Sequence, residues 1–408
     1  MKKATAAALI LALMLAMAGC RNIFEKEYCN VADYTAEAET ATKEPVDDTI
    51  SSYAALKRGI TDLVSKHVES AELKFQNYDG SVAQDISQAC WEVKSSTALG
   101  AFAVDYISYD TTRISSASQA EIFITYKRTA EQVAALEAVS NLRALVGRIS
   151  TALENGETYL AVELNSAYVT SEEVKAYISQ AYYDDAQAVP FLPSAEVNIF
   201  PDSGVDRIVE ITFDYGQTTE ELAGIRQKLS DACAKLTADL FPEEETSTTD
   251  NPQGTESPSP TATPQEARQA DTAYTLAQRL KNACVCDKTA GATAYDALVK
   301  GEASSEGVAM AYEALCQTVG IECQVVSGSL DDSAHFWNIV TVDGISAHVD
   351  VSRWSGGTQA VFLMTDGAMR SSYSWDASQY PVCDKDYDYF GTSATSQSTD
   401  GPEAVTGA

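Results

Sequence analysis

The chain has 408 residues and a formal net charge of −31 at pH 7, from 59 acidic and 28 basic residues. A surface this acidic repels phosphate groups, so we expect no binding to nucleic acid. Hydrophobic residues make up 45% of the chain, which suits about two or three ordinary domains and excludes a largely disordered protein.

The start of the chain has the pattern of an export signal. Two lysines are followed by an apolar stretch at 4–17, which is too short to span a bilayer, and small residues come directly before Cys20. The run Leu-Ala-Met-Ala-Gly-Cys at 15–20 resembles a bacterial lipobox, in which the cysteine is acylated and becomes the new N-terminus. We therefore expect residues 1–19 to be a lipoprotein signal peptide and Cys20 to be the lipidation site. Acyl chains would then hold the protein on the extracytoplasmic face of the cell membrane.

Two regions of different character follow the expected anchor. Residues 20–48 are polar and acidic without a regular pattern, which predicts a lipidated tether. From 49 to 69, apolar residues recur near the helical period, and His67 belongs to this stripe. We therefore interpret His67 as a partly buried helix residue rather than as a base or a ligand.

Residues 49–241 contain two similar successions of elements. The alternating segments 121–126 and 209–215 predict strands, and each leads through a capping-box sequence that starts at Thr129 or Thr218. The predicted helices that follow run over 129–146 and 218–236. Each strand is preceded by a strand, a helix and another strand, which predicts two β-α-β-β-α units in tandem. We interpret this half as a binding or spacer region, because it shows no catalytic constellation.

The next boundaries follow from composition. Residues 242–268 contain five prolines among Ser, Thr and Glu, which predicts a disordered linker. Residues 392–408 are polar and predict a disordered tail. We expect the region between them, 269–391, to form a separate domain.

The nine cysteines do not suggest a metal site. Their spacing lacks a zinc pattern and the chain has only three histidines, so we expect neither a metal nor a cofactor. Outside the cytoplasm disulfides could form, and their pairing is left open. Cys90 and Cys233 lie in apolar helical patterns and are expected to be buried free thiols.

The region 269–391 carries the chemistry. Its predicted elements are a helix over 272–284, a helix from 304 to 319, a strand over 322–327, and a hairpin of strands over 333–340 and 347–351. This order places Ser305 at the N-terminus of a helix, His335 on one strand and Asp350 on the next. A papain-like core has this layout, because a helix N-terminus favours an anionic nucleophile, a histidine serves as base, and an acid orients the histidine.

Ordered sequence blocks in this region resemble the bacterial transglutaminase-like family. They are Thr-Ala-Tyr-Asp-Ala-Leu at 293–298, Glu-Gly-Val-Ala at 306–309, Gly-Ile-Glu-Cys at 320–323, His-Phe-Trp-Asn at 335–338 and His-Val-Asp-Val at 348–351. The resemblance implies an α+β chain that ends in a papain-like domain of a helix bundle and an antiparallel sheet. It places His335 and Asp350 at the family's histidine and acid, and Ser305 where the family keeps its nucleophilic cysteine. Candidates for the cleft wall are Tyr295, Trp337 and Trp354, and the two tryptophans could equally pack in the core. We expect His348 to pack on the outer face of its strand.

The serine changes the expected function. A cysteine at this position forms a thiolate paired with imidazolium, whereas a serine hydroxyl stays protonated and must lose its proton during attack. Cys316 lies on the same helix about 16 Å further along its axis, so it cannot replace the nucleophile. We predict a catalytically inactive domain that binds a peptide, a protein or a cell-wall component. The alternative is an amide or ester hydrolase, or an acyl transferase, that uses Ser305, His335 and Asp350.

Overall fold

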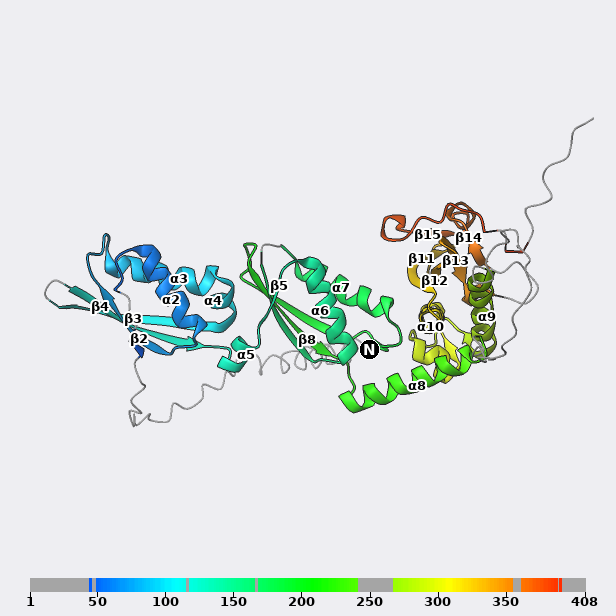
Figure 1. The fold of residues 1–408 in the computed structure, drawn as a ribbon, viewed down its shortest axis with the longest axis horizontal. Helices are drawn as coiled ribbons and strands as arrows, with labels where there is room; N and C mark the ends of the chain where they lie inside the picture. Colours follow the sequence, from blue (N-terminus) through cyan, green and yellow to red (C-terminus); the bar gives the residue numbers. More distant parts are fainter. Residues whose placement is uncertain are drawn as a thin grey trace, which may run out of the picture.

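The computed structural model describes residues 44–45, 49–114, 117–165, 168–240, 267–354, 361–387 and 389–390. They form three units of mixed helices and strands that lie in a row, which confirms the predicted α+β class (Figure 1). The expected signal peptide, Cys20 and the predicted tail over 392–408 lie outside the described residues. None of the described helices has the length and apolar character that crossing a membrane requires.

The first unit is a four-stranded sheet with helices packed on one face (Figure 1). Its strands lie in the order β1 (Glu44–Pro45), β2 (Ser70–Phe75), β4 (Ala117–Tyr126) and β3 (Val104–Ile114). Its helices are α2 (Tyr53–Ser65), α3 (Val82–Ser96) and α4 (Ala98–Ala103). The short β1 lies within the predicted tether and runs parallel to β2. Leu56 and Ile60 of α2 are fully buried against the sheet residues Leu73 and Ile122, so the apolar stripe of the helix forms the core of the unit.

The second unit repeats this order of strands. They are β5 (Glu137–Val139), β6 (Tyr159–Leu164), β8 (Arg207–Asp214) and β7 (Ser194–Phe200), again with a short parallel edge strand. Its helices are α6 (Leu142–Asn155), α7 (Ser171–Asp184) and α8 (Thr219–Thr237). α8 begins at a capping box in which Thr218 and Glu221 bond each other's backbone N–H, as the sequence pattern predicts.

The predicted helix over 129–146 is wrong in extent. The capping box at Thr129 and Gln132 is present, but it starts only the short helix α5 (Ala130–Ala134). The chain then forms β5, and the next helix starts at Asn141, whose side chain accepts a hydrogen bond from the Ala144 N–H. Residues Glu137–Val139 pair with β6 and form a strand. This pairing between segments overrides the helical period of the apolar residues in the local sequence.

His67 is not a helix residue. It follows α2 in a left-handed conformation with φ 54°, and its ring stacks on Tyr126 with the centroids 3.8 Å apart. Its Nε2 lies 2.9 Å from the carbonyl oxygen of Arg128. The side chain therefore ties the end of α2 to the segment that leads into the second unit.

The C-terminal domain is built on a five-stranded antiparallel sheet. The strands lie in the order β14 (Val361–Met364), β13 (Ile345–Asp350), β12 (Ser333–Val342), β11 (Glu322–Leu330) and β15 (Tyr373–Trp375). The remaining elements are α9 (Ala267–Ala283), α10 (Ser305–Thr318), α11 (Asp366–Met369), the strand pair β9 (Val285–Cys286) and β10 (Glu302–Ala303), and helical turns over 296–300, 351–353 and 377–379. α10 is buried on every side from Gly307 to Cys316. It lies between the sheet, α9 and α8.

The second unit and the C-terminal domain share one core. Leu229 and Cys233 of α8 belong to the same buried cluster as Leu276 of α9 and Leu315 of α10. On the other side of α10, the backbone N–H of Ala186 donates to the buried Glu313 carboxylate at 3.1 Å. The two units are therefore packed as one body rather than joined by a loose hinge.

Glu313 gives this joint a pH dependence. Burial, reinforced by Asp184 and Asp185, raises the pKa of Glu313 to about 8. The unfolded chain releases the proton near pH 4.5, so between these values the folded protein binds more protons and its stability falls as the pH rises. Glu313→Gln keeps an oxygen for the Ala186 N–H and has no proton to lose. Between pH 5 and pH 8, we expect the free energy of unfolding of Glu313→Gln to fall less than that of the unmodified protein, by on the order of 1–4 kcal/mol.

Denaturant unfolding of the full chain at pH 5, 6.5 and 8 measures this difference. Glu302→Gln removes one charge from an exposed position just before α10 and is the control. A Glu313→Gln curve that runs parallel to that of the unmodified protein at all three pH values would contradict the expectation.

Candidate functional site

Ser305 is the first residue of α10, and the packing around the helix start is tight. The side chain of Ser304 caps the helix by accepting a hydrogen bond from the Gly307 N–H at 3.5 Å. A Cβ on Gly307 would lie 2.8 Å from the Ala303 Cβ and 2.9 Å from the Thr293 carbonyl oxygen. Glycine is therefore required for the helix to begin this close to the preceding segment, which places the half-buried Ser305 beside the sheet.

The structure brings His335 and Asp350 into direct contact. His335 lies near the start of β12 and Asp350 ends β13, the neighbouring strand. The His335 Nε2 donates to the Asp350 Oδ2 at 2.7 Å. Because Nε2 carries the proton, the lone pair of the ring is on Nδ1, as a general base requires.

Four donors surround the buried Asp350 carboxylate. In addition to His335, the Tyr373 hydroxyl donates to Oδ2 at 2.8 Å, and Oδ1 accepts from the Ser352 hydroxyl at 2.6 Å and the Arg353 N–H at 3.3 Å. A carboxylate that is 1% exposed is stable only when its oxygens are hydrogen-bonded in this way. The acid is therefore held in a single orientation and directs the imidazole.

Sequence reasoning missed Tyr373 and Ser352. Tyr373 comes from β15 at the far edge of the sheet, 23 residues after Asp350, and no local pattern marks it. Burial, with the Asp350 charge beside it, raises the pKa of Tyr373 well above its usual value. Ser352 follows Asp350 by two residues, and its hydroxyl is 3.5 Å from the His335 Nε2.

Ser305 lies next to this pair without bonding it. The backbone N–H of Phe336, the residue after His335, donates to the Ser305 Oγ at 3.4 Å. Within the described residues, no hydrogen bond joins the Ser305 hydroxyl to His335. Ser305, His335 and Asp350, the three residues predicted from the sequence, thus lie together, but Ser305 and His335 are not hydrogen-bonded to each other.

A second histidine–aspartate pair lies beneath the first. His348 was expected on the outer face of its strand, but it is completely buried. The Trp337 Nε1–H donates to the His348 Nδ1 at 3.0 Å, so the His348 Nε2 carries the ring proton and donates to the Asp366 Oδ1 at 2.8 Å. Burial lowers the pKa of His348, and the ring is therefore a neutral structural link.

Cys383 lies close enough to raise the question of a metal site. The ligand atoms of His348, Asp366 and Cys383 are all within 4.8 Å of one another. A metal would need the lone pair of the His348 Nε2, but the donor on the other side of the ring, Trp337, requires the proton to be on that nitrogen. These residues therefore fit a hydrogen-bonded chain and do not fit a metal centre.

The aromatic residues proposed for the cleft wall are dispersed. Trp337 is 1% exposed and supports His335 from the core, with the ring centroids 6.2 Å apart. Trp354 packs against Tyr274 of α9 and Phe362 of β14, at 5.1 and 5.9 Å. These two residues therefore belong to the packing of the domain.

Tyr295 lies at the joint with the second unit. It is half-buried, and its ring centroid is 6.5 Å from that of Phe191 in the second unit. The Lys300 ammonium lies 5.6 Å from the centroid of the same ring.

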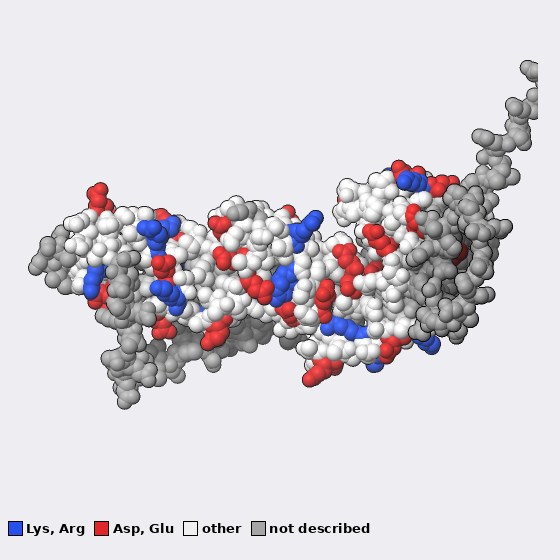
Figure 2. All heavy atoms as spheres, in the orientation of Figure 1, with Lys and Arg blue, Asp and Glu red and all other residues white. Residues whose placement is uncertain are grey.

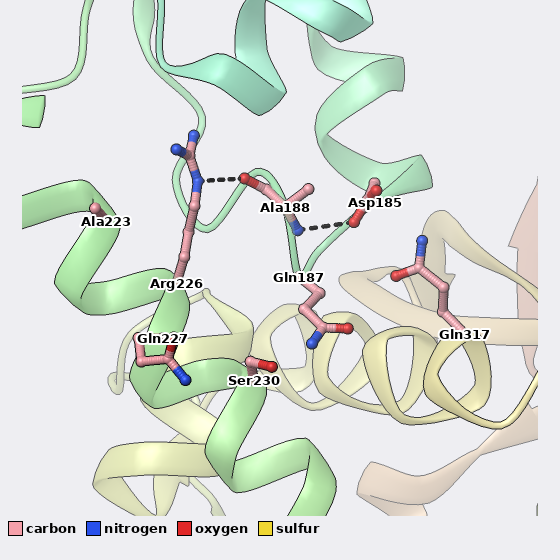
Figure 3. A pocket seen from close by; sticks show the side chains of 8 residues that line it. All are labelled: Asp185, Gln187, Ala188, Ala223, Arg226, Gln227, Ser230 and Gln317. Atoms are coloured by element: carbon pink, nitrogen blue, oxygen red, sulfur yellow. Dashed lines mark hydrogen bonds between the residues drawn. The ribbon is translucent and has the colours of Figure 1, made fainter.

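A hollow of about 450 Å³ lies at the other end of α10, where the loop after α7 meets α8 (Figure 3). Its polar groups are used in the joint itself, because the Arg226 Nε donates to the Ala188 carbonyl at 2.7 Å and the Ala188 N–H donates to the Asp185 carboxylate at 2.8 Å. Gln317, which lines it, is about 18 Å along the helix from Ser305. The hollow is therefore separate from the candidate site.

Comparison with known families matches residues 259–355 to the Transglutaminase-like superfamily. Ser305, His335 and Asp350 fall within the matched residues, and this part of the chain is a transglutaminase-like domain. A solved structure titled "Crystal structure of a TGase" shares 9% sequence identity at a TM-score of 0.26, and the alignment covers 64% of this chain and 66% of that one. A comparison with curated proteins finds no match. The assignment of the domain therefore rests on the family match.

The four-donor cage around Asp350 predicts a specific stability loss. Tyr373→Phe leaves the ring in place and removes one donor from a buried carboxylate, which we expect to cost about 2 kcal/mol of unfolding free energy. Tyr380→Phe is the matched control. The Tyr380 hydroxyl accepts a hydrogen bond from the Ser327 N–H, and this N–H is exposed and can bond to water instead. We expect this control to cost less than about 1 kcal/mol. Denaturant unfolding of both variants measures the difference, and equal losses would refute the special role of Tyr373.

Proposed function

We propose that this protein is a membrane-anchored extracytoplasmic lipoprotein whose transglutaminase-like domain binds a peptide, a protein or a cell-wall component without cleaving it. The observation that carries the proposal is the state of Ser305. Its hydroxyl accepts from the Phe336 N–H and makes no hydrogen bond to His335 among the described residues, although the His335–Asp350 pair is intact.

The chemistry of the nucleophile supports this choice. A cysteine at the start of a helix and near imidazolium is a thiolate before substrate arrives, so it needs no hydrogen bond to a base at the moment of attack. A serine must transfer its proton to the base as it attacks, and this requires a formed contact of about 3 Å. Ser305 makes no such contact with His335 among the described residues, so the His335–Asp350 pair remains while the bond-breaking step lacks an activated nucleophile.

The alternative function is hydrolysis or acyl transfer by Ser305. The favouring observation is the Asp350 cage, which holds His335 at 2.7 Å in the tautomer that a serine enzyme needs. In an unliganded protein, a catalytic hydrogen bond is often longer than in the reacting complex. A bound substrate could therefore bring Ser305 and His335 together.

The arrangement of the units suits a surface protein. Three units lie in a row, with the transglutaminase-like domain at the end opposite the first unit (Figure 1). Acidic side chains are spread over the face in Figure 2 and gather where the second unit meets the C-terminal domain. A partner that carries positive charge would be attracted to such a face.

Probe labelling of the full chain distinguishes the two functions. We expect the unmodified protein to remain unlabelled at Ser305 by a serine-directed fluorophosphonate, since the hydroxyl is not activated. We expect Ser305→Cys to react with iodoacetamide at least about tenfold faster than a free cysteine at pH 7, because the helix start and His335 favour the thiolate. Peptide mass spectrometry separates residue 305 from the natural cysteines.

Two further variants act as controls. Ser305→Cys combined with His335→Ala should lose the acceleration, because the imidazole that pairs with the thiolate is absent. Ser305→Ala gives the background labelling. If the fluorophosphonate labels the unmodified protein at Ser305 and the label disappears in Ser305→Ala, the domain is an active serine enzyme and the binding proposal is wrong.

A further inference from the structure

The second unit reaches the candidate site through α7. The hydroxyl of Tyr183, near the end of α7, donates to the Glu306 Oε1 at 2.8 Å. The ring of Tyr183 also lies 6.1 Å from that of Phe336, centroid to centroid. Glu306 follows Ser305 in the sequence, and Phe336 follows His335. The Tyr183 side chain of the second unit therefore contacts the residue after Ser305 and the residue after His335.

This contact is held by the packing on both sides of it. The Glu313–Ala186 hydrogen bond lies two helical turns further along α10. At the end of α8, the Arg279 side chain of α9 donates to the carbonyl oxygens of Leu236 and Ala238, both at 2.7 Å. Together with the shared core, these contacts fix the position of Tyr183 relative to Ser305. The second unit is therefore a permanent wall beside the site.

Glu306 is the charged group of this wall. It is half-buried, and burial raises its pKa. Among the described residues, Tyr183 is the only hydrogen-bond partner of its side chain, and neither a lysine nor an arginine pairs with it. The first turn of α10 favours an anion here, which offsets part of the cost of burial.

Aromatic rings lie close to this carboxylate. The Tyr183 hydroxyl donates to it, and the Tyr183 ring is a neighbour of the Phe336 ring from the C-terminal domain. The carboxylate attracts a cation through its charge, and an electron-rich ring adds to the attraction where the cation meets its face. A neutral or anionic group in the same place would leave the half-buried charge uncompensated or would repel it.

We propose that Tyr183, Glu306 and Phe336 form a subsite, completed by the second unit, that takes the cationic side chain of a lysine or arginine in a bound peptide. The subsite rests on the proposed binding function, because Glu306 is the residue directly after Ser305. The subsite specifies that the bound group is positively charged, which the proposed function leaves open. It also gives the second unit a part in recognition beyond that of a spacer.

Charged thiol reagents measure the subsite in the full-length Ser305→Cys variant. The thiolate attacks the sulfenyl sulfur of a methanethiosulfonate, a disulfide forms, and methanesulfinate leaves. We use the cationic aminoethyl, the neutral methyl and the anionic sulfonatoethyl reagents and normalise each rate to that of free cysteine. We expect the cationic reagent to exceed the neutral one by about fivefold, and the anionic reagent to be the slowest.

Matched variants separate the subsite from the general acidity of the surface. Glu306→Gln should lower the cation-to-neutral ratio to near one, while Glu302→Gln, exposed and close to the same helix start, should leave it near fivefold. Tyr183→Leu removes an aromatic face and the wall, so we expect a lower ratio together with faster reaction of all three reagents. Circular dichroism of each variant checks that the chain is folded.

The outcomes distinguish the two proposals. If Glu306→Gln and Glu302→Gln have the same ratio, the cation subsite is wrong, whatever the reactivity of the thiol. If the neutral reagent reacts at residue 305 no faster than with free cysteine, the intact machinery assumed in the proposed function is absent, and the charge ratio still reports on the subsite. A fivefold ratio that depends on Glu306 and Tyr183 supports it.

Discussion

A helix with no solvent-facing side determines how this protein is put together. α10 is buried continuously from Gly307 to Cys316, so every side of it must be covered. β11 and β12 cover one side and α9 another, and α8 of the second unit completes the enclosure. For this reason the second unit shares a core with the transglutaminase-like domain, and its side chains lie at a fixed distance from the start of α10, where Ser305 lies.

At the candidate site, the governing constraint is the buried carboxylate of Asp350. Its four donors orient it without any contribution from residue 305. If Ser305 stands where the family keeps its cysteine, as the sequence resemblance implies, the exchange removes the thiolate and leaves the orientation of His335 unchanged. A site can in this way lose its nucleophile and keep its shape, which is the physical basis of the proposed binding without cleavage. The neutral chain from Trp337 through His348 to Asp366 supports the same strands from beneath.

Local sequence signals predicted the elements well where those signals are self-contained. The capping boxes at Thr129 and Thr218 both formed, because each involves residues three positions apart. The helix expected after Thr129 was broken by β5, since pairing with β6 outweighed the helical period of the apolar residues. His348 was misplaced for a related reason: strand alternation assigns a face, but it does not show that α11 and Trp375 cover that face as well.

By itself, the sequence determined most of the helices and strands and indicated the three residues of the candidate site, because helix caps, strand alternation and short motifs act over a few positions. Only the tertiary structure decided what surrounds those residues. Tyr373 reaches Asp350 from 23 residues away, and Tyr183 reaches Glu306 from 123 residues away. Contacts of this kind arise when buried faces from distant segments pack together, and local propensity does not encode which faces will meet. The serine at position 305 could be read in the sequence, but its separation from His335 and the wall beside it are consequences of packing.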